Sequence, residues 1–585
     1  MGGSPRTRIR GDRFSLSEAA SRPAVAKPIA ACGDSSGSDR SGRLEPQTCT
    51  EYFASDSEED EEPDHQHQQV PDLFPLGKIV VDPAEYPATM LQEAAYAFPG
   101  SKSRLNLVVP FSLDGVVDPD LVEMAARRVV LDNDGLRVTI AASAAGPSSV
   151  PSGALLAVVA PKVGRLVAVI PNGPIGDDSA MTAILEEHQT HAFTPGECPV
   201  RIVLVGHAGH YHTMSVVCAR YACDLVGVHT FVRSLCDTYS GRVGGGGDDD
   251  GGSSGSGKCT LAQLGTWEAK LWRSDPAMLE QASAFWTSCC RSSASGAILN
   301  KLHLPATEGS ITTDATVPEW LFLPVELDAD ITTSFKDFLI LPDGADDIDG
   351  DDHGLLLCLT SFAVLMKHAA RRDDYVMGSS VSVRDLSPEA TAGLIAPLTN
   401  DVPLQVITSN TSSFIDIFIA LGRTLNKVRR RSMCAVRLFK SLHGLDTFPV
   451  KFEFIKSQEV AELSSELYSA GFLGSDNVGG QDEVPLGSMG SRCKLRYRAP
   501  PSEALFPKET SLVFRAWESP DPDNERIFAG LWFRSAMFSQ AYIESLLAKF
   551  SLIVEEASNE PHITLVKLAA ELNGRSSGNG NHDDI

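Results

Sequence analysis

Residues 216–228 read VVCARYACDLVGV, and the interpretation of the chain depends on this stretch. An apolar run typical of a buried strand ends at Arg220, and Asp224 stands directly before a second apolar run. An aspartate in front of an apolar periodic run is a common N-cap of an α-helix. The stretch therefore predicts a strand, a turn at the aspartate and a helix, with polar side chains at the junction.

Strands and helices alternate on both sides of this junction. Residues 105–115, LNLVVPFSLDG, predict a strand, and Asp118-Pro119 predicts the N-cap and first turn of an amphipathic helix that ends before Gly135. Residues 155–171 and 201–221 each predict a pair of strands, and a helix is expected at about 227–239. This order is typical of an α/β fold.

The alternation is repeated in the second half of the chain. Residues 260–290 predict one or two helices, whose Trp267, Trp272 and Trp286 are more typical of a core than of a binding site. From Trp320 to about 567 the pattern gives a strand, an acidic loop, an apolar helix at 354–369, a strand and further helices and strands. The sequence therefore predicts two α/β lobes with a cleft between them.

Composition excludes several classes of partner. The chain has 585 residues, a formal charge of -26 and a pI near 4.9, which argues against nucleic acid or an anionic membrane. Twelve cysteines without a CxxC pair favour a reducing, cytoplasmic location over secretion. The longest apolar run, residues 355–366, is too short to span a bilayer. Arginines among serines near the N-terminus weakly resemble an organelle transit peptide, but a disordered tail is the favoured interpretation.

Low-complexity segments border or interrupt the predicted lobes. Residues 1–70 are acidic and serine-rich, 571–585 are polar, and 241–258 are rich in glycine and aspartate. Gly252, Gly257 and Lys258 match a phosphate-binding G-x-x-x-x-G-K loop, but no buried strand precedes them, so a flexible insertion is the better interpretation. The acidic loop near residue 350 lacks the spacing of an EF-hand, and no metal site is predicted.

The order of landmarks between residues 74 and 567 resembles the condensation domains of nonribosomal peptide synthetases, relatives of chloramphenicol acetyltransferase. The opening YPATMLQEAAYAFPGSKSRLNLVVPFSLDG contains Gln92 on a helix before the first strand, and DNDGLRVTI matches the end of an RHExLRT segment at Arg137. YVMGSSVSVRD resembles the strand that ends in GxPxxxR, with Arg384 in place, and GLIAPLTNDVPLQV resembles GxFVNTLPLR through Asn400. The resemblance implies two chloramphenicol acetyltransferase-like lobes, residues 71–305 and 306–570, in a V-shaped pseudo-dimer with a central tunnel.

The family's catalytic motif is HHxxxDG, whose second histidine acts as a general base or positions the acceptor. Here Ala219 and Arg220 stand at the two histidine positions, and of the motif only Asp224 is retained. Arginine does not release its proton near neutral pH, so Arg220 is unable to serve as the base. His229, about one helical turn after Asp224, is the remaining candidate base, against the more ordinary role of a packing histidine. Cys223 lacks a histidine partner in the sequence and is expected to be inert.

A second departure concerns the arginine that opens RHExLRT, which in the family is thought to pair with the motif aspartate. Its position here is Asp132. Two carboxylates facing each other need a cation between them, and Arg220 is the predicted bridge between Asp132 and Asp224. The alternative is that DND, residues 132–134, is aligned wrongly with the family's segment and that Arg220 points to solvent. Arg137, Arg384 and Asn400 are expected to be structural or to line the tunnel.

Three functions remain open. The retained scaffold without its base favours a pseudoenzyme that binds a carrier-protein-tethered chain, a synthetase or a tailoring enzyme. An active acyltransferase, forming an ester or amide by proximity alone, is the alternative. A structural relic with a phosphorylated acidic tail is the third. No tightly bound cofactor is expected. An acyl-CoA or a phosphopantetheine-linked thioester, supplied in trans by an acyl-carrier or peptidyl-carrier protein, is the expected substrate or ligand.

Overall fold

The computed structural model describes residues between 84 and 574. The described ranges are 84–97, 106–114, 117–142, 155–171, 178–206, 211–240, 259–274, 276–291, 301–307, 320–327, 330–331, 333, 335, 352–386, 391, 393–434, 448–455, 484–486, 493–497, 509–518 and 527–574. The predicted tail 1–70, the insertion 241–258 with its glycine-rich loop and residues 343–351 of the acidic loop lie outside these ranges. Residues 84–307 are called the first half below, and residues 320–574 the second half.

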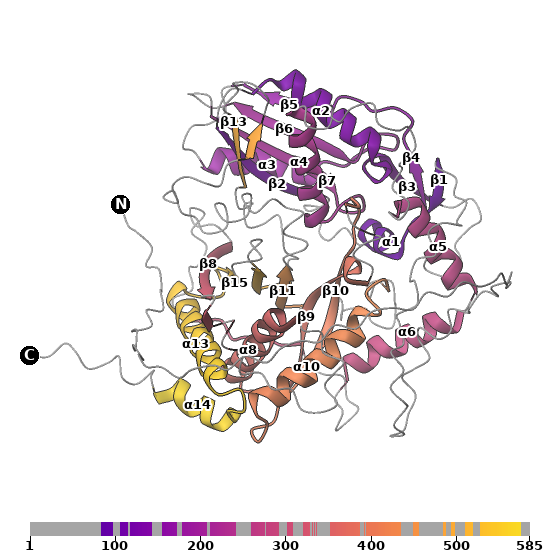
Figure 1. Ribbon diagram of the computed structural model, residues 1–585. Helices are drawn as coiled ribbons and strands as arrows, with labels where there is room; N and C mark the ends of the chain where they lie inside the picture. Colours follow the sequence, from indigo (N-terminus) through magenta and orange to yellow (C-terminus); the bar gives the residue numbers. More distant parts are fainter. Residues whose placement is uncertain are drawn as a thin grey trace, which may run out of the picture. The chain divides into compact units, whose positions relative to one another are not determined.

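The main sheet of the first half has the strand order β12-β13-β2-β7-β6-β5 (Figure 1). Its strands are β2 (Asn106–Asp114), β5 (Val167–Ile170), β6 (Val200–Gly206), β7 (Tyr211–Ala219), β12 (Val484–Leu486) and β13 (Cys493–Tyr497). β7 pairs antiparallel with β2 on one side and with β6 on the other, so the strand that leads to Arg220 is central. A central strand packs on both faces, which explains its nearly continuous apolar sequence.

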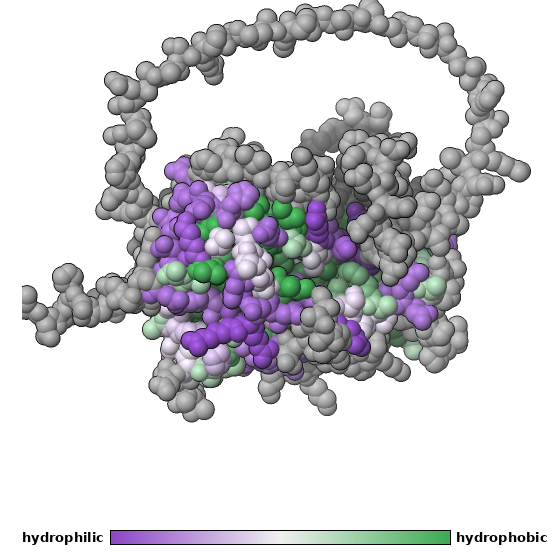
Figure 2. Space-filling model, turned by 90° about the horizontal axis from the view of Figure 1, so that it is seen from below, coloured by the Kyte–Doolittle hydropathy of each residue, from purple (hydrophilic) through white to green (hydrophobic). Residues whose placement is uncertain are grey.

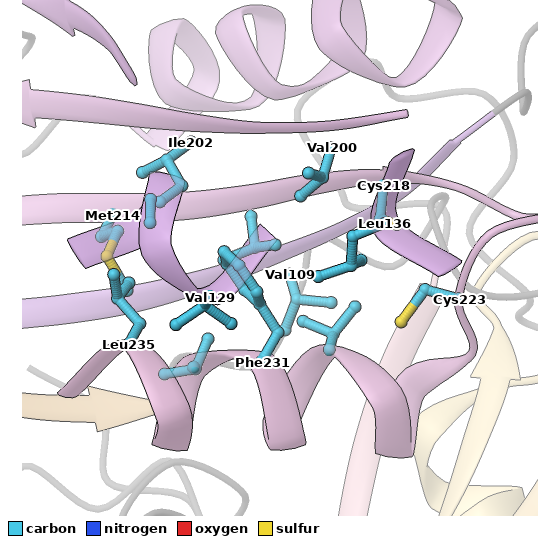
Figure 3. Close-up of a cluster of buried hydrophobic side chains, with 14 of the residues drawn as sticks. Val109, Val129, Leu136, Val200, Ile202, Met214, Cys218, Cys223, Phe231 and Leu235 are labelled. Carbon is cyan, nitrogen blue, oxygen red and sulfur yellow. The ribbon is translucent and has the colours of Figure 1, made fainter. Parts of the chain in front are cut away.

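Helices cover both faces of this sheet. α2 (Pro119–Asp132) and α4 (Leu225–Tyr239) pack on one face, and α3 (Asp178–Thr190) packs on the other. Figure 3 shows side chains of α2 and α4, among them Val129 and Phe231, meeting Val109 of β2 in one apolar cluster. Asp118 caps α2 through its side chain, and proline follows at the first helical position, as the sequence predicts.

A small sheet of order β1-β4-β3 lies in the same half, formed by β1 (Glu85–Pro87), β3 (Val138–Ala142) and β4 (Leu155–Val159). The predicted pairing within residues 155–171 is therefore wrong, because β4 pairs with β1 and β3 whereas β5 pairs parallel with β6. Alternating apolar residues identify a strand but not its neighbour. The other helical elements are α1 (Met90–Ala97), the 3-10 helix η4 (Asp134–Arg137), α5 (Leu261–Ser274) and α6 (Pro276–Cys289).

The second half is built on a sheet of order β10-β9-β11-β14-β15-β8. Its strands are β8 (Trp320–Leu327), β9 (Asp374–Ser382), β10 (Thr399–Ile407), β11 (Val450–Ile455), β14 (Leu512–Glu518) and β15 (Ile527–Arg534). Its helices are α8 (His353–Ala370), the 3-10 helix η8 (Val383–Leu386), α10 (Phe414–Arg429), α13 (Gln540–Asn559) and α14 (Leu565–Gly574). In the view of Figure 2, hydrophilic residues cover much of the molecule's face and hydrophobic residues gather near its middle.

α8 is the apolar helix predicted at 354–369. It is long and apolar enough to cross a membrane by composition, but 72% of its 18 residues are buried inside the protein. Phe362 of α8 stacks on Phe514 of β14 with ring centroids 5.0 Å apart, and Tyr375 of β9 donates a hydrogen bond to the carbonyl of Ala363. α8 therefore has the contacts of a core helix in an α/β layer.

The second half contributes the strands β12 and β13 to the main sheet of the first half. β13, which follows β11 in the second half, pairs antiparallel with β2, from Lys494 opposite Asp114 to Tyr497 opposite Phe111. A single boundary between residues 305 and 306 therefore does not divide the sheets. α14 also ends at Gly574, four residues beyond the predicted end of the second lobe.

Candidate functional site

The backbone between β7 and α4 folds into one tight turn, called the Arg220 turn below (residues 219–223). The amides of Ala222 and Cys223 both donate to the carbonyl of Ala219, at 2.8 and 3.2 Å. Asp224 then caps α4 by accepting a hydrogen bond from the Gly227 amide at 2.8 Å. Strand, turn and helix thus follow one another as the sequence predicts, and Arg220 is half-buried at the end of the strand.

The Asp224 carboxylate is bound by groups from the second half of the chain. Arg384 donates from its two terminal nitrogens at 2.7 and 3.1 Å, and the Leu398 amide and the Thr399 hydroxyl donate at 3.0 and 2.9 Å. Burial alone would raise the pKa of Asp224, but Arg384 and the hydrogen bonds from Gly227 and Leu398 hold that pKa below its ordinary value. Asp224 is therefore ionised and joins the two halves through a buried ion pair, called the buried lock below.

The predicted bridge from Asp132 through Arg220 to Asp224 is wrong. Asp132 is the last residue of α2 and pairs instead with Arg128 of the same helix at 2.9 Å, with half of its side chain exposed. The cation beside Asp224 is Arg384. Asp132 and Arg128 are four residues apart and therefore neighbours on the surface of α2, where they pair with each other.

Arg137 and Asn400 have structural contacts. Arg137 pairs with Asp134 and donates to the carbonyl of Ala160 at 3.2 Å, which joins the end of η4 to the segment after β4. Asn400 is buried and donates to the carbonyls of Ser432 and Cys434 at 2.8 and 3.0 Å. Both residues therefore hold backbone segments in place.

His229 is fully buried on α4, with its ring 5.8 Å from that of Phe111 in an edge-to-face arrangement. Burial lowers the pKa of His229 to about 3, and the positive charge of Arg515 adds to this effect. Such an imidazole is neutral at pH 7 but is a very weak proton acceptor, because a general base works best with a pKa near the working pH. The structure therefore favours the packing role of His229 over the catalytic one.

Cys223 is buried as well. Its thiol lies within hydrogen-bonding distance of the Cys218 sulfur and of the Asp224 carbonyl, the latter at 3.2 Å. Burial and the neighbouring Cys218 raise the pKa of the Cys223 thiol well above its ordinary value. A nucleophilic cysteine needs the opposite shift, so Cys223 has the environment of an inert thiol.

α1, which lies in the same half of the chain, also contacts the Arg220 turn. Gln92 is fully buried and donates to the Tyr221 carbonyl at 3.3 Å, and the Tyr96 ring lies edge-on to that of Tyr221 at 5.9 Å. The sequence singled out Gln92 by resemblance but gave it no contact. The T-x-x-Q pattern from Thr89 to Gln92 is a capping-box signal that would have placed this glutamine at the start of a helix.

A row of charged side chains, of which Lys451, Glu453 and Arg515 are buried, crosses the second sheet and was missed by sequence reasoning. Lys451 of β11 pairs with Asp401 of β10 and with Glu453 at 2.7 Å each, and Glu453 accepts from Arg515 of β14 at 2.6 Å. Arg515 and Lys451 hold the pKa of Glu453 at about 2 against the opposing effect of burial. The alternation of charged and aromatic residues in KFEF, residues 451–454, indicates a strand with one polar face. The described residues contain no group of three or more histidine, cysteine or acidic side chains able to hold a metal ion.

No protein-family model and no curated protein matches the sequence. Among solved structures, the X-domain from teicoplanin biosynthesis in its complex with OxyB has a TM-score of 0.59 and 17% identity, covering 84% of this chain and 97% of the matched chain. The condensation domain of the Monacolin K polyketide synthase MokA has a TM-score of 0.55 and 14% identity, covering 82% and 99%. The starter condensation domain of rhizomide synthetase RzmA has a TM-score of 0.55 and 13% identity, covering 82% and 98%.

Identities of 13 to 17% show the fold alone. The mixture of sheets and helices, the order of the landmarks and the extent of the matches agree with one another. The V-shaped arrangement and the central tunnel stay predictions. The chain therefore has the fold of the condensation domains of nonribosomal peptide synthetases and of the related X-domain.

Proposed function

We propose that the protein is a condensation-domain-like binding domain of acyl-thioester metabolism, of the nonribosomal peptide kind, which does not catalyse by the histidine mechanism. The observation that carries the proposal is the environment of Asp224. Its carboxylate is fully engaged by Arg384, Leu398 and Thr399, while Arg220 stands where the motif has its base. The Arg220 turn thus retains the structural contact and lacks the proton acceptor.

Packing between the two halves supports the same proposal. Ile395, Ile455 and Trp517 of the second half belong to one apolar cluster with Val228 and Phe231 of α4. Side chains that pack against each other leave less room for a substrate between the halves. This feature favours a rigid platform over an open tunnel.

The kind of partner is part of the proposal. One solved relative is an X-domain in complex with OxyB, and another is a starter condensation domain in complex with C8-CoA. A tailoring enzyme, a synthetase, or an acyl-carrier or peptidyl-carrier protein in trans is the partner that we propose, in the cytoplasm. An acyltransferase working by proximity, with an acyl-CoA or carrier-bound thioester as donor, is the second candidate, since Arg220 lies at the family's catalytic position.

The test measures thioester consumption. Purified protein is given acetyl-CoA, octanoyl-CoA and octanoyl-pantetheine with an amine or an alcohol acceptor, beside Arg220→His and Arg220→Gln variants. We expect no free thiol above buffer from the native protein, because no described group at the turn accepts a proton near pH 7.

Turnover by the native protein overturns the proposal and makes it an enzyme. Turnover by Arg220→His alone, with Arg220→Gln inactive, means that substrates reach the turn and only the base is missing. If all three proteins are inactive, the turn is retained architecture, and binding of the same octanoyl compounds, followed by calorimetry, becomes the next measurement.

A further inference from the structure

α1 is anchored at its first residue by a buried acid from another helix. Glu268 of α5 is only 3% exposed, and its Oε1 accepts hydrogen bonds from the Met90 amide at 2.9 Å and from the Trp272 ring nitrogen at 3.3 Å. The Met90 amide belongs to the first turn of α1, where backbone N–H groups have no partner within the helix. Glu268 therefore satisfies an N-terminal amide of α1.

α1 in turn supports the Arg220 turn. Gln92 donates to the Tyr221 carbonyl at 3.3 Å, and its side chain also accepts from the Thr89 amide at 3.1 Å. Glu93, one residue further, accepts from the Leu155 amide at 3.2 Å and ties the helix to β4. The start of α1 thus joins α5, β4 and the Arg220 turn.

The surroundings of Glu268 favour a neutral carboxylic acid, because the side chain is buried and no cation lies among its contacts within the described residues. Both donors reach Oε1, and two N–H donors alone would favour the ionised form, so burial without a cation is what favours the protonated acid. The titratable groups around it are Glu93 of α1 and Cys434 after α10, and neither brings a positive charge. Burial, reinforced by Glu93 and opposed by the two hydrogen bonds, raises the pKa of Glu268 to about 8.

We propose that the protonated Glu268 carboxyl is a proton-operated anchor of α1, and that a rise in pH loosens α1 and, through Gln92, the Arg220 turn. When α1 opens, Glu268 meets water and its pKa returns toward the ordinary value near 4.3. Between these two pKa values, near 4.3 in the open state and about 8 in the closed state, the open state binds fewer protons than the closed state. Opening of α1 therefore becomes easier as pH rises from the lower value to the higher one. The inference holds whether or not the turn catalyses a reaction.

Hydrogen exchange of the full-length protein tests the anchor. Amides of residues 90–97 and 219–223 are followed by mass spectrometry between pH 6 and 8, after correction for the intrinsic pH dependence of exchange. We expect protection of both segments to fall by about tenfold per pH unit in the native protein. In Glu268→Gln, which keeps a carbonyl acceptor and does not ionise, we expect protection to be independent of pH. Glu280→Gln, the same change at an exposed position on α6, is the matched control and should behave as the native protein.

A second variant tests the coupling. Gln92→Met removes the donor to Tyr221 and keeps a side chain of similar length, so α1 should still respond to pH while the turn no longer follows it. If Glu268→Gln retains the native pH dependence in α1, Glu268 is not the anchor and the proposal is overturned. If the turn follows pH equally well in Gln92→Met, the coupling through Gln92 is wrong.

Discussion

At the scale of single residues, Asp224 is a structural contact between the two halves. Its carboxylate caps α4 and binds Arg384, Leu398 and Thr399, so it contributes to the folded state whatever stands at position 220. A buried carboxylate that loses its cation is strongly destabilising, because burial without a partner costs far more than the pair contributes. Asp224 therefore has a structural role at this junction.

Arg384→Met should lower the free energy of unfolding by about 3–5 kcal/mol, because it leaves Asp224 buried beside an apolar side chain. Asp224→Asn in the same chain should recover part of the loss. Because the pKa of Asp224 is held below its ordinary value, the ion pair contributes fully above about pH 5 and is lost as pH falls through the folded-state pKa. Urea unfolding at pH 7 measures the cost of each substitution, and repeating it on the native protein at lower pH measures the loss of the ion pair's contribution. Arg128→Met, at the exposed pair with Asp132, is the control and should cost less than about 1 kcal/mol; an equal cost at both sites would contradict the buried lock.

At the scale of secondary-structure elements, the close contact between β15 and β8 leaves no room for a side chain at position 530. Gly530 of β15 lies opposite Pro324 of β8, and the Phe322 ring covers it. A Cβ atom at Gly530 would lie 2.3 Å from the ring and 2.6 Å from the Leu323 carbonyl oxygen. The register of β15 against β8 thus depends on the absence of a side chain there.

Gly530→Ala should therefore destabilise the protein by about 1–3 kcal/mol, because the backbone or Phe322 must move to make room. Gly164→Ala is the matched control, since nothing lies within 4 Å of the added atom, and its effect should stay within about 0.5 kcal/mol. Thermal unfolding followed by circular dichroism compares the two variants. Equal midpoints would show that the contact over Gly530 relaxes without cost.

At the scale of the whole molecule, the two halves share one of the protein's apolar clusters. Trp517 of β14 is 1% exposed and belongs to the cluster that contains α4 and β2, whereas Trp320 of β8, 2% exposed, packs in a separate cluster with Val513 and Trp532. β13 also completes the first sheet from the second half. These connections predict that the described part of the two halves unfolds as one cooperative unit.

Trp517→Ala should cost about 3–5 kcal/mol and reduce hydrogen-exchange protection in α4 as well as in β14, because its cavity opens into a core built by both halves. Trp320→Ala removes a tryptophan of similar burial from the second half alone. Its effect on α4 should reflect only the global loss of stability. Unchanged protection of α4 in Trp517→Ala would show that the halves unfold independently.

The sequence by itself determined the elements around the junction and the fold. The apolar run of β7, the aspartate N-cap of α4 and the Asp118-Pro119 start of α2 are local signals, because a capping side chain or a period of apolar residues acts within a few positions. The ordered landmarks then gave the condensation-domain fold. Arg384 was singled out, but its partner was not, since it lies 160 positions from Asp224 along the chain.

Only the tertiary structure decided the partners and the protonation states. Asp132 and Asp224 have the same side chain but different partners and different burial. Asp132 is half exposed and pairs with Arg128, whereas Asp224 is buried and pairs with Arg384. The sequence predicts that β4 and β5 pair with each other, but in the structure β4 pairs with β3 and β5 pairs with β6, in different sheets. Burial also lowers the pKa of His229 and raises that of Glu268, and burial is a property of the packed molecule. Contacts between distant residues depend on how the sheets close on their helices, which no local pattern encodes.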